Sequence, residues 1–167
     1  MGTLAVRPLT SLDLKRIMER LAPWEGRSII ELFAGKAQLS QTALKAGVTS
    51  VLLIEKHPVL ATRLKQRWRG DSRVKVWQLD FRPALRRIKD HGWKFDLCFI
   101  DPPFDLKLLA PAMDIVCKYE LLNPDGIMLV KSSPQEWLEP DDCWEEVFVA
   151  QKSDLYLGAW KWRPEKI

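Results

Sequence analysis

Four consecutive residues, Asp101, Pro102, Pro103 and Phe104, have the clearest chemical potential in this chain. They directly follow an apolar run, residues 95–100, that predicts a buried strand, so they lie where the chain leaves the strand for a cleft. The two prolines fix φ at about −65° and have no N–H groups, which makes the turn stiff and leaves carbonyl groups free to accept hydrogen bonds. The aspartate adds further acceptors, and the phenylalanine adds an aromatic face.

This cluster matches a planar ring that carries an amino group. The amino N–H groups would donate to Asp101 and to a neighbouring carbonyl, and the ring would stack on Phe104. Nucleobases have this shape and chemistry. The alternative is a plain strand exit with a capping aspartate and two loop prolines, and the four residues alone leave both interpretations open.

Acidic residues occur at the ends of three other predicted strands as well. The four acids, in chain order, are Glu31, Glu55, Asp80 and Asp101, and Gly35 follows the first of them. In a parallel sheet, ligands bind beyond the carboxyl ends of the strands, where the strand order reverses. Gly35 would let the backbone approach a ligand, Glu55 suits the paired hydroxyls of a ribose, and Asp80 suits an adenine amino group. Each acid alone can also be a helix cap, but four on successive strand ends favour a ligand site.

Helical patterns and short apolar runs alternate along the chain and must position these acids. Strands are expected at residues 28–33, 51–54, 74–79, 95–100, 127–131, 144–150 and 155–162. Helices are expected at residues 10–22, from 36 to 46, at 58–68, from 83 onward, and at 106–119. Thr10 and Asp13 predict a capping box for the first helix, and residues 123–126 predict a turn before the fifth strand.

This alternation predicts an α/β fold with a single doubly wound, mainly parallel, seven-stranded sheet. The last two strands have only a short turn, residues 151–153, between them and predict a C-terminal antiparallel hairpin. We expect one domain over residues 1–167, in which a short N-terminal segment and a helix, about residues 1–25, precede the first strand.

Length and composition predict a cytoplasmic globular protein. The chain has 167 residues, 47% of them hydrophobic, and contains neither a long uncharged apolar stretch nor an apolar segment at its start. Its three cysteines are widely spaced among apolar residues, which is typical of reduced core thiols. The two histidines have no neighbours suited to a zinc site or a catalytic triad, so no metal is expected.

Positive charge is grouped on three of the predicted helices, and the net charge is +4. The groups are Lys15, Arg16 and Arg20; Arg63, Lys65, Arg67 and Arg69; and Arg82, Arg86, Arg87 and Lys89. Any one group can be the solvated face of an amphipathic helix. The three together favour an anionic partner such as a nucleic acid.

The acidic strand ends resemble those of the S-adenosylmethionine-dependent class I methyltransferases, which have a Rossmann-like fold. The matching features are the run Glu31–Gly35, Glu55, Asp80 and the Asp-Pro-Pro-Phe turn. Within this superfamily the chain is most similar to the RsmD family, which methylates the exocyclic N2 of a guanine in bacterial 16S rRNA. Residues 7–10 are similar to the Arg-Pro-Thr segment that precedes the first strand in that family.

The resemblance implies roles for the residues at these positions. Glu31 and Gly35 would contact the methionine part of S-adenosylmethionine, Glu55 the ribose and Asp80 the adenine. The complete expected cofactor site is Glu31, Phe33, Gly35, Glu55, Lys56, Asp80, Phe81 and Asp101. Asp101 and the Pro102 carbonyl would hold the target amino group in a turn completed by Pro103, and Phe104 would stack on the base. The implied partner is ribosomal RNA or the small ribosomal subunit, with a monomer as the default and no membrane or metal.

Two departures from the family pattern keep alternatives open. The first loop reads Phe-Ala-Gly-Lys-Ala-Gln-Leu-Ser, in which Ala37 and Ser40 replace glycines and Lys36 replaces a small residue. A positive φ at Ala37 would cost about 1 kcal/mol and weaken cofactor binding. Only six residues precede Arg7, where the family usually carries a basic arm. The alternatives are a catalytically silent relative that binds RNA or protein, an amino-methyltransferase of another RNA or of DNA, and a small-molecule methyltransferase.

Overall fold

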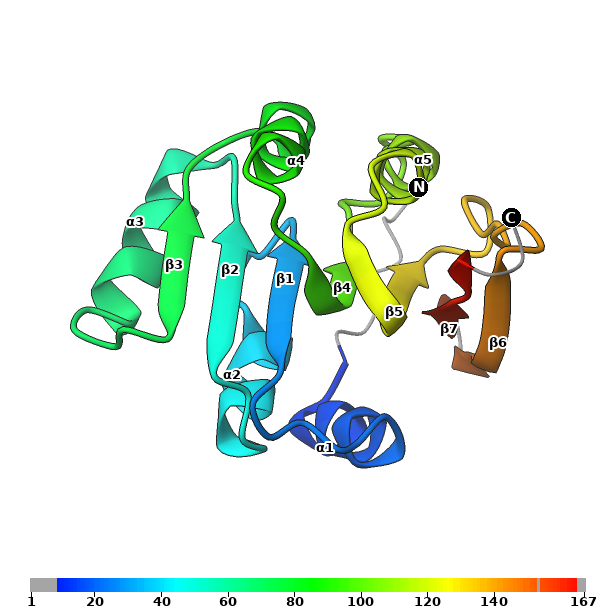
Figure 1. Cartoon of the computed structure of the whole chain (residues 1–167), viewed down its shortest axis with the longest axis horizontal. Coiled ribbons are helices and arrows are strands. Elements are labelled where there is room, and N and C mark those ends of the chain that lie inside the picture. Colours follow the sequence, from blue (N-terminus) through cyan, green and yellow to red (C-terminus); the bar gives the residue numbers. More distant parts are fainter. Residues whose placement is uncertain (1–8, 153, 165–167) are drawn as a thin grey trace, which may run out of the picture.

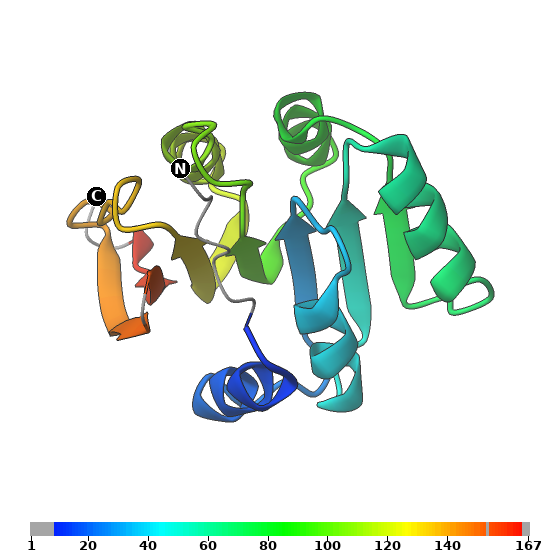
Figure 2. The same ribbon diagram turned by 180° about the vertical axis from the view of Figure 1, so that it is seen from behind.

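The computed structural model describes residues 9–152 and 154–164, and within them one seven-stranded sheet lies between two layers of helices (Figures 1 and 2). The strands are β1 (Ser28–Leu32), β2 (Ser50–Ile54), β3 (Val74–Trp77), β4 (Phe95–Ile100), β5 (Leu122–Ser132), β6 (Trp144–Lys152) and β7 (Leu155–Trp162). The helices are α1 (Ser11–Arg20), α2 (Gln38–Lys45), α3 (Pro58–Arg67), α4 (Phe81–Asp90) and α5 (Leu109–Lys118).

The strand order is β3-β2-β1-β4-β5-β7-β6, so the order reverses between β1 and β4. The pairs β3-β2, β2-β1, β1-β4 and β4-β5 are parallel, whereas β7 is antiparallel to both β5 and β6. This arrangement confirms the predicted doubly wound, mainly parallel sheet and its C-terminal hairpin. Leu32, Ile54 and Ile100 lie in one row across the sheet, and the residues that follow them therefore leave it at one edge.

Alternate side chains of the strands pack into two separate hydrophobic layers, because successive residues of a strand point to opposite faces. One layer holds α1, α2 and α3 against residues such as Ile29, Leu97 and Leu129. The other holds α4 and α5 against Ile30 and Cys98. Since both faces are covered, the central strands are almost continuously apolar, as expected for a parallel sheet.

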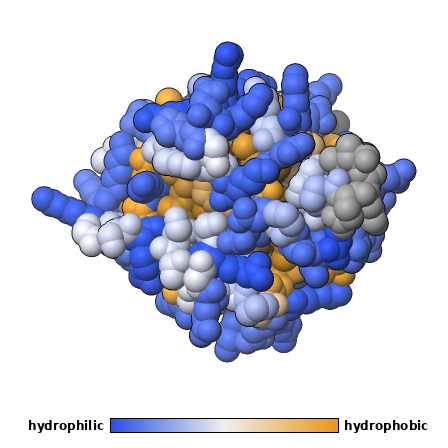
Figure 3. Space-filling view, viewed as in Figure 1, coloured by the Kyte–Doolittle hydropathy of each residue, from blue (hydrophilic) through white to orange (hydrophobic). Residues whose placement is uncertain are grey.

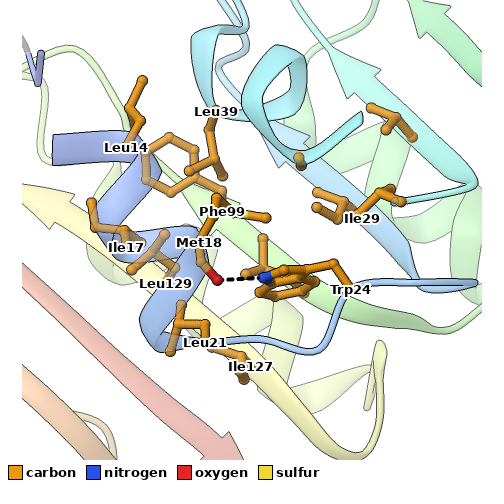
Figure 4. Packing of buried hydrophobic residues seen from close by; sticks show 14 of the residues in the cluster. Leu14, Ile17, Met18, Leu21, Trp24, Ile29, Leu39, Phe99, Ile127 and Leu129 are labelled. Atoms are coloured by element: carbon orange, nitrogen blue, oxygen red, sulfur yellow. Dashed lines mark hydrogen bonds between the residues drawn. The ribbon is translucent and has the colours of Figure 1, made fainter. Parts of the chain in front are cut away.

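Helix α1 packs on the sheet through a stripe of apolar residues (Figure 4). Leu14, Ile17 and Met18 are buried against Phe99 and Leu129 in the same cluster. Trp24 is buried in the same cluster, and its Nε1 donates a hydrogen bond to the carbonyl oxygen of Met18 at 2.6 Å.

The predicted capping box begins α1. The side chain of Thr10 accepts a hydrogen bond from the N–H of Asp13 at 3.1 Å, and the Asp13 carboxylate accepts one from the N–H of Thr10 at 2.9 Å. Arg7 and Pro8 of the family-like segment lie outside the described residues.

The residues expected to form a turn, 123–126, lie within the bounds of β5 but leave its pairing with β4, and Asp125 has a positive φ of 62°. The strand pairing passes from Phe95–Leu122 to Leu97–Ile127, so these residues form a bulge in β5. Asn123 Nδ2 donates a hydrogen bond to Asp96 Oδ1 at 3.0 Å, which holds the bulge against β4.

The predicted helix at residues 106–119 is shorter, since α5 begins at Leu109. Pro111 lies in its first turn, where the missing N–H has no helical acceptor in any case.

The face of the molecule seen in Figure 3 is mainly hydrophilic, with hydrophobic residues exposed near its middle. In the part of the chain that the structure describes, no helix is both long and apolar enough to cross a membrane.

Candidate functional site

A cavity of about 950 Å³ lies beyond the carboxyl ends of the central strands, where the strand order reverses. The predicted residues that line it are Phe33, Gly35, Glu55, Lys56, Asp80, Phe81, Asp101, Pro102, Pro103 and Phe104. A smaller cavity of about 140 Å³ is lined by Glu31, and it shares Phe33, Gly35 and Asp101 with the larger one. The structure thus brings all the predicted site residues together around two adjoining cavities.

The loop between β1 and α2 forms one wall of both cavities and has an unusual backbone. Phe33, Gly35 and Ala37 all have positive φ, at 58°, 54° and 48°. Ala37 therefore adopts the positive φ whose cost the sequence analysis considered. Ala37 is buried at the first turn of α2, and holding a residue other than glycine in this conformation costs on the order of 1 kcal/mol.

Glu31 is a buried carboxyl group at the end of β1, with an exposed fraction of 4%. Its Oε2 accepts hydrogen bonds from the backbone N–H of Ser40, at 3.2 Å, and from the Ser40 hydroxyl. Ser40 therefore holds Glu31 in place. Burial raises the pKa of Glu31 to about 7; the Ser40 hydrogen bonds oppose this rise, and the charge of Asp101 adds to it.

The raised pKa of Glu31 predicts a pH-dependent stability. The unfolded chain has the ordinary pKa of 4.5, so between 4.5 and about 7 the folded protein binds more protons than the unfolded chain. Its free energy of unfolding should therefore fall as the pH rises through this window. Glu31→Gln removes the titration and keeps an oxygen for Ser40.

We expect the stability of Glu31→Gln, relative to the parent, to increase from about pH 4.5 to about pH 7 by a few kcal/mol and then level off. Urea unfolding of both proteins across this range measures it. Any fixed cost of the new amide is the same at each pH, so a constant difference would contradict the prediction.

Glu55 joins the loops that follow β1 and β2. Its Oε2 accepts a hydrogen bond from the N–H of Gly35 at 2.8 Å, and its Oε1 accepts one from the N–H of His57 at 2.7 Å. Only 8% of the residue is exposed. Each oxygen retains acceptor capacity, so the carboxylate can also bind ligand hydroxyls in the cavity.

Asp80 lies at the cavity wall and is also the N-cap of α4. Its Oδ1 accepts a hydrogen bond from the N–H of Arg82 at 3.1 Å, and Lys56 Nζ lies 3.6 Å from its Oδ2. Asp80 is therefore both a helix cap, as one of the two interpretations predicted, and a residue of the cavity wall. Next to it, the rings of Phe81 and Phe33 meet with centroids 5.1 Å apart and form an apolar wall.

Asp101 forms an ion pair that the sequence analysis missed. Lys131 Nζ lies 2.9 Å from both carboxylate oxygens and 5.6 Å from the centre of the Phe104 ring. Burial raises the pKa of Asp101, and the charge and hydrogen bonds of Lys131 oppose the rise. Lys131 is the first residue after the apolar run of the fifth strand, a position equivalent to those of Glu55 and Asp101, and this signal could have identified it.

Among the described residues, no three His, Cys, Asp or Glu side chains gather in a way that could hold a metal ion. The side chains that the site offers to a ligand include carboxylates, lysines, an arginine, a histidine and aromatic rings.

Known proteins resemble this chain in sequence and in fold. A family model described as conserved hypothetical protein 95 matches residues 5–154. Ribosomal RNA small subunit methyltransferase D of Haemophilus influenzae is 23% identical over 144 residues, which cover 83% of this chain and 74% of that protein.

Solved structures share the fold. A hypothetical protein of Thermus thermophilus superposes with a TM-score of 0.75 at 21% identity, covering 95% of this chain and 90% of its own. The N-methyltransferase NodS of Bradyrhizobium japonicum gives a TM-score of 0.64 at 18% identity, with 91% and 93% covered.

Proposed function

The chain belongs to the family described as conserved hypothetical protein 95, and on this premise we propose that it is an S-adenosylmethionine-dependent methyltransferase of ribosomal RNA, similar to RsmD. Its target in this proposal is the exocyclic N2 amino group of a guanine in 16S rRNA. The observation that carries the proposal is the place of Asp101, which lines both the large cavity and the smaller one beside Glu31.

The residues around the cavities fit the cofactor. Glu31, in the smaller cavity, is the carboxyl group that can bind the methionine ammonium, and Glu55 offers acceptors to the ribose hydroxyls. Asp80 can accept from the adenine amino group, and the apolar wall of Phe33 and Phe81 can contact the adenine ring. When bound, the cofactor supplies an electrophilic methyl group on a positively charged sulfur.

The Asp-Pro-Pro-Phe turn holds the target amino group in this proposal. Asp101 and the Pro102 carbonyl accept its N–H groups, which orients the nitrogen lone pair toward the methyl group, and Phe104 stacks on the base. Once methylated, the nitrogen has one proton too many, and the Asp101 carboxylate is placed to accept it. Catalysis is thus mainly positioning and electrostatics.

The direct test is transfer of labelled methyl groups to ribosomal RNA and to small-subunit particles. Nuclease digestion and mass spectrometry of the product should yield N2-methylguanosine at one position. Transfer to another nucleotide, or to another position on the base, would contradict the guanine N2 target but not the proposed methyltransferase activity.

The rival function is a catalytically silent relative, which the strained Ala37 in the β1-α2 loop would favour. Calorimetry with S-adenosylmethionine separates the two functions. No binding at millimolar cofactor would contradict the enzymatic proposal.

Exposed arginines on α3 and α4 provide the phosphate contacts in this proposal. Both helices start beside the cavity, since His57, Pro58 and Phe81 line it, and Arg63 and Arg86 are exposed on them. We expect Arg63→Glu with Arg86→Glu to weaken binding of ribosomal RNA about tenfold or more and to flatten its dependence on salt concentration.

A matched control is Lys45→Glu with Lys118→Glu, which makes the same change in charge at positions on α2 and α5. Filter binding at several salt concentrations measures both variants. If the control weakens binding as much as the arginine variant does, net charge and not these helices sets RNA affinity.

A further inference from the structure

Lys131 lies at the centre of the site although it belongs to a strand that the cofactor assignment does not use. In the β4-β5 pairing Ile100 lies opposite Val130, so the next residues of the two strands, Asp101 and Lys131, lie side by side. On its other side Lys131 pairs with Leu157 of β7, which fixes its backbone within the sheet. The position of the lysine is therefore set by two strand partners.

The side chain of Lys131 is nearly buried, with an exposed fraction of 12%. A buried ammonium group is costly unless it is paired, and here both oxygens of Asp101 lie 2.9 Å from Nζ. A carboxylate offers about four acceptor positions, so this contact leaves Asp101 able to accept two further N–H groups. The ion pair thus orients the carboxylate and leaves some of its acceptor positions free.

The lysine also balances the charge of the site. Two carboxyl groups, Glu31 and Asp101, lie close enough to interact electrostatically, and burial disfavours the ionised form of both. Asp101 faces the cation of Lys131 on β5 and the carboxyl group of Glu31 on β1. Lys131 is the cation that opposes the effect of burial on Asp101, so without it the ionised form of Asp101 is disfavoured.

Lys131 lines both cavities and lies 5.6 Å from the centre of the Phe104 ring. It therefore contacts the residue expected to hold the amino group and lies near the ring expected to stack on the base. An ammonium group in this place can act on the reaction through Asp101.

We propose that Lys131 is the positioning residue of the methylation site: it holds the Asp101 carboxylate ionised and oriented so that its free acceptor positions receive the target amino group. This inference rests on the proposed function for its catalytic meaning, whereas the ion pair can be tested on its own.

The first experiment compares Lys131→Met and Lys131→Arg with the parent in single-turnover methyl transfer to small-subunit particles. Lys131→Met keeps the length of the side chain without its charge, and we expect the rate to fall at least about tenfold, with cofactor and RNA affinities within about twofold of the parent. Lys131→Arg keeps a cation that can pair with both oxygens and should recover most of the rate.

The pH dependence of the rate distinguishes positioning from a structural role. In Lys131→Met the acidic limb of the pH–rate profile should move to higher pH, because Asp101 loses the cation that lowers its pKa. Glu31→Gln in both backgrounds removes the titration of the other carboxyl group. Lys161→Met, on β7 and outside both cavities, is the matched control and should leave the rate and the profile unchanged.

The second experiment does not depend on activity. The carboxyl carbon of Asp101, followed by ¹³C NMR, should titrate at a higher pH in Lys131→Met than in the parent. If it titrates at the same pH, the positioning role is overturned whatever the rates. If the titration shifts but the parent transfers no methyl group to any RNA, the proposed function fails while the ion pair stands. Should Lys131→Met fail to fold, Lys131→Gln provides the same comparison.

Discussion

Asp101→Ala is expected to abolish methyl transfer while leaving most of the cofactor and RNA affinity in place. Its carboxylate is the only side-chain carboxylate in the Asp-Pro-Pro-Phe turn, and it is proposed to act on the target amino group rather than on phosphate or ribose. A loss of about a thousandfold in single-turnover rate corresponds to about 4 kcal/mol of transition-state stabilisation.

Removing Asp101 also leaves Lys131 nearly buried without its partner, which can destabilise the fold by several kcal/mol. Asp101→Asn is therefore the companion variant. It keeps an oxygen for Lys131 but loses the charge and presents an NH₂ donor where the target amino group needs an acceptor. Thermal unfolding should show Asp101→Asn to be the more stable of the two, and its transfer rate should remain at least about a hundredfold below that of the parent.

Phe104 provides a contrast within the same turn. Phe104→Ala removes a stacking face worth about 1–3 kcal/mol per base, so it should slow turnover without removing the acceptors. Phe104→Tyr should restore most of the rate, because any aromatic ring can stack. If Asp101→Asn transfers methyl groups at the parental rate, the turn is a plain strand exit and the assignment of the active site fails.

Glu55→Ala is expected to weaken binding of both S-adenosylmethionine and S-adenosylhomocysteine by roughly 1.5–3 kcal/mol, or about 10-fold to 150-fold. The variant removes the acceptor of the ribose hydroxyls. It also frees the N–H groups of Gly35 and His57, which Glu55 holds at 2.8 and 2.7 Å, so the loops around the ligand become less ordered.

An analogue of S-adenosylhomocysteine without ribose hydroxyls separates these two effects. In a double-mutant cycle, the analogue should lose affinity for the parent and show a smaller additional loss with Glu55→Ala, because the interacting groups are then absent on both sides. Calorimetry measures all four combinations. Equal losses for the analogue and the natural ligand would show that Glu55 acts only by ordering the loops.

Much of the site could be predicted from the sequence because its signals are local. A short apolar run followed by an acid marks a strand end, and in a parallel sheet all such ends meet at one edge. Glu31, Glu55, Asp80 and Asp101 therefore came together as expected without any knowledge of their contacts. The helix cap at Thr10 was predictable for the same reason, since it depends on neighbouring residues.

The tertiary structure alone decided the partners of these groups. Ser40 binds Glu31 across nine residues, Gly35 binds Glu55 across twenty, and Lys131 binds Asp101 across thirty. No local rule specifies such pairs, because they depend on the strand register and on the path of each loop back to the sheet.

The bulge in β5 has the same cause. The residues at 123–126 have the composition of a turn and leave the pairing with β4, while the contact of Asn123 with Asp96 holds them against that strand. Sequence by itself therefore determined which groups reach the cavity edge, through local strand and turn chemistry. Long-range pairing of β4 with β5 determined that a lysine holds the aspartate there, because only the folded sheet brings those two strand ends together.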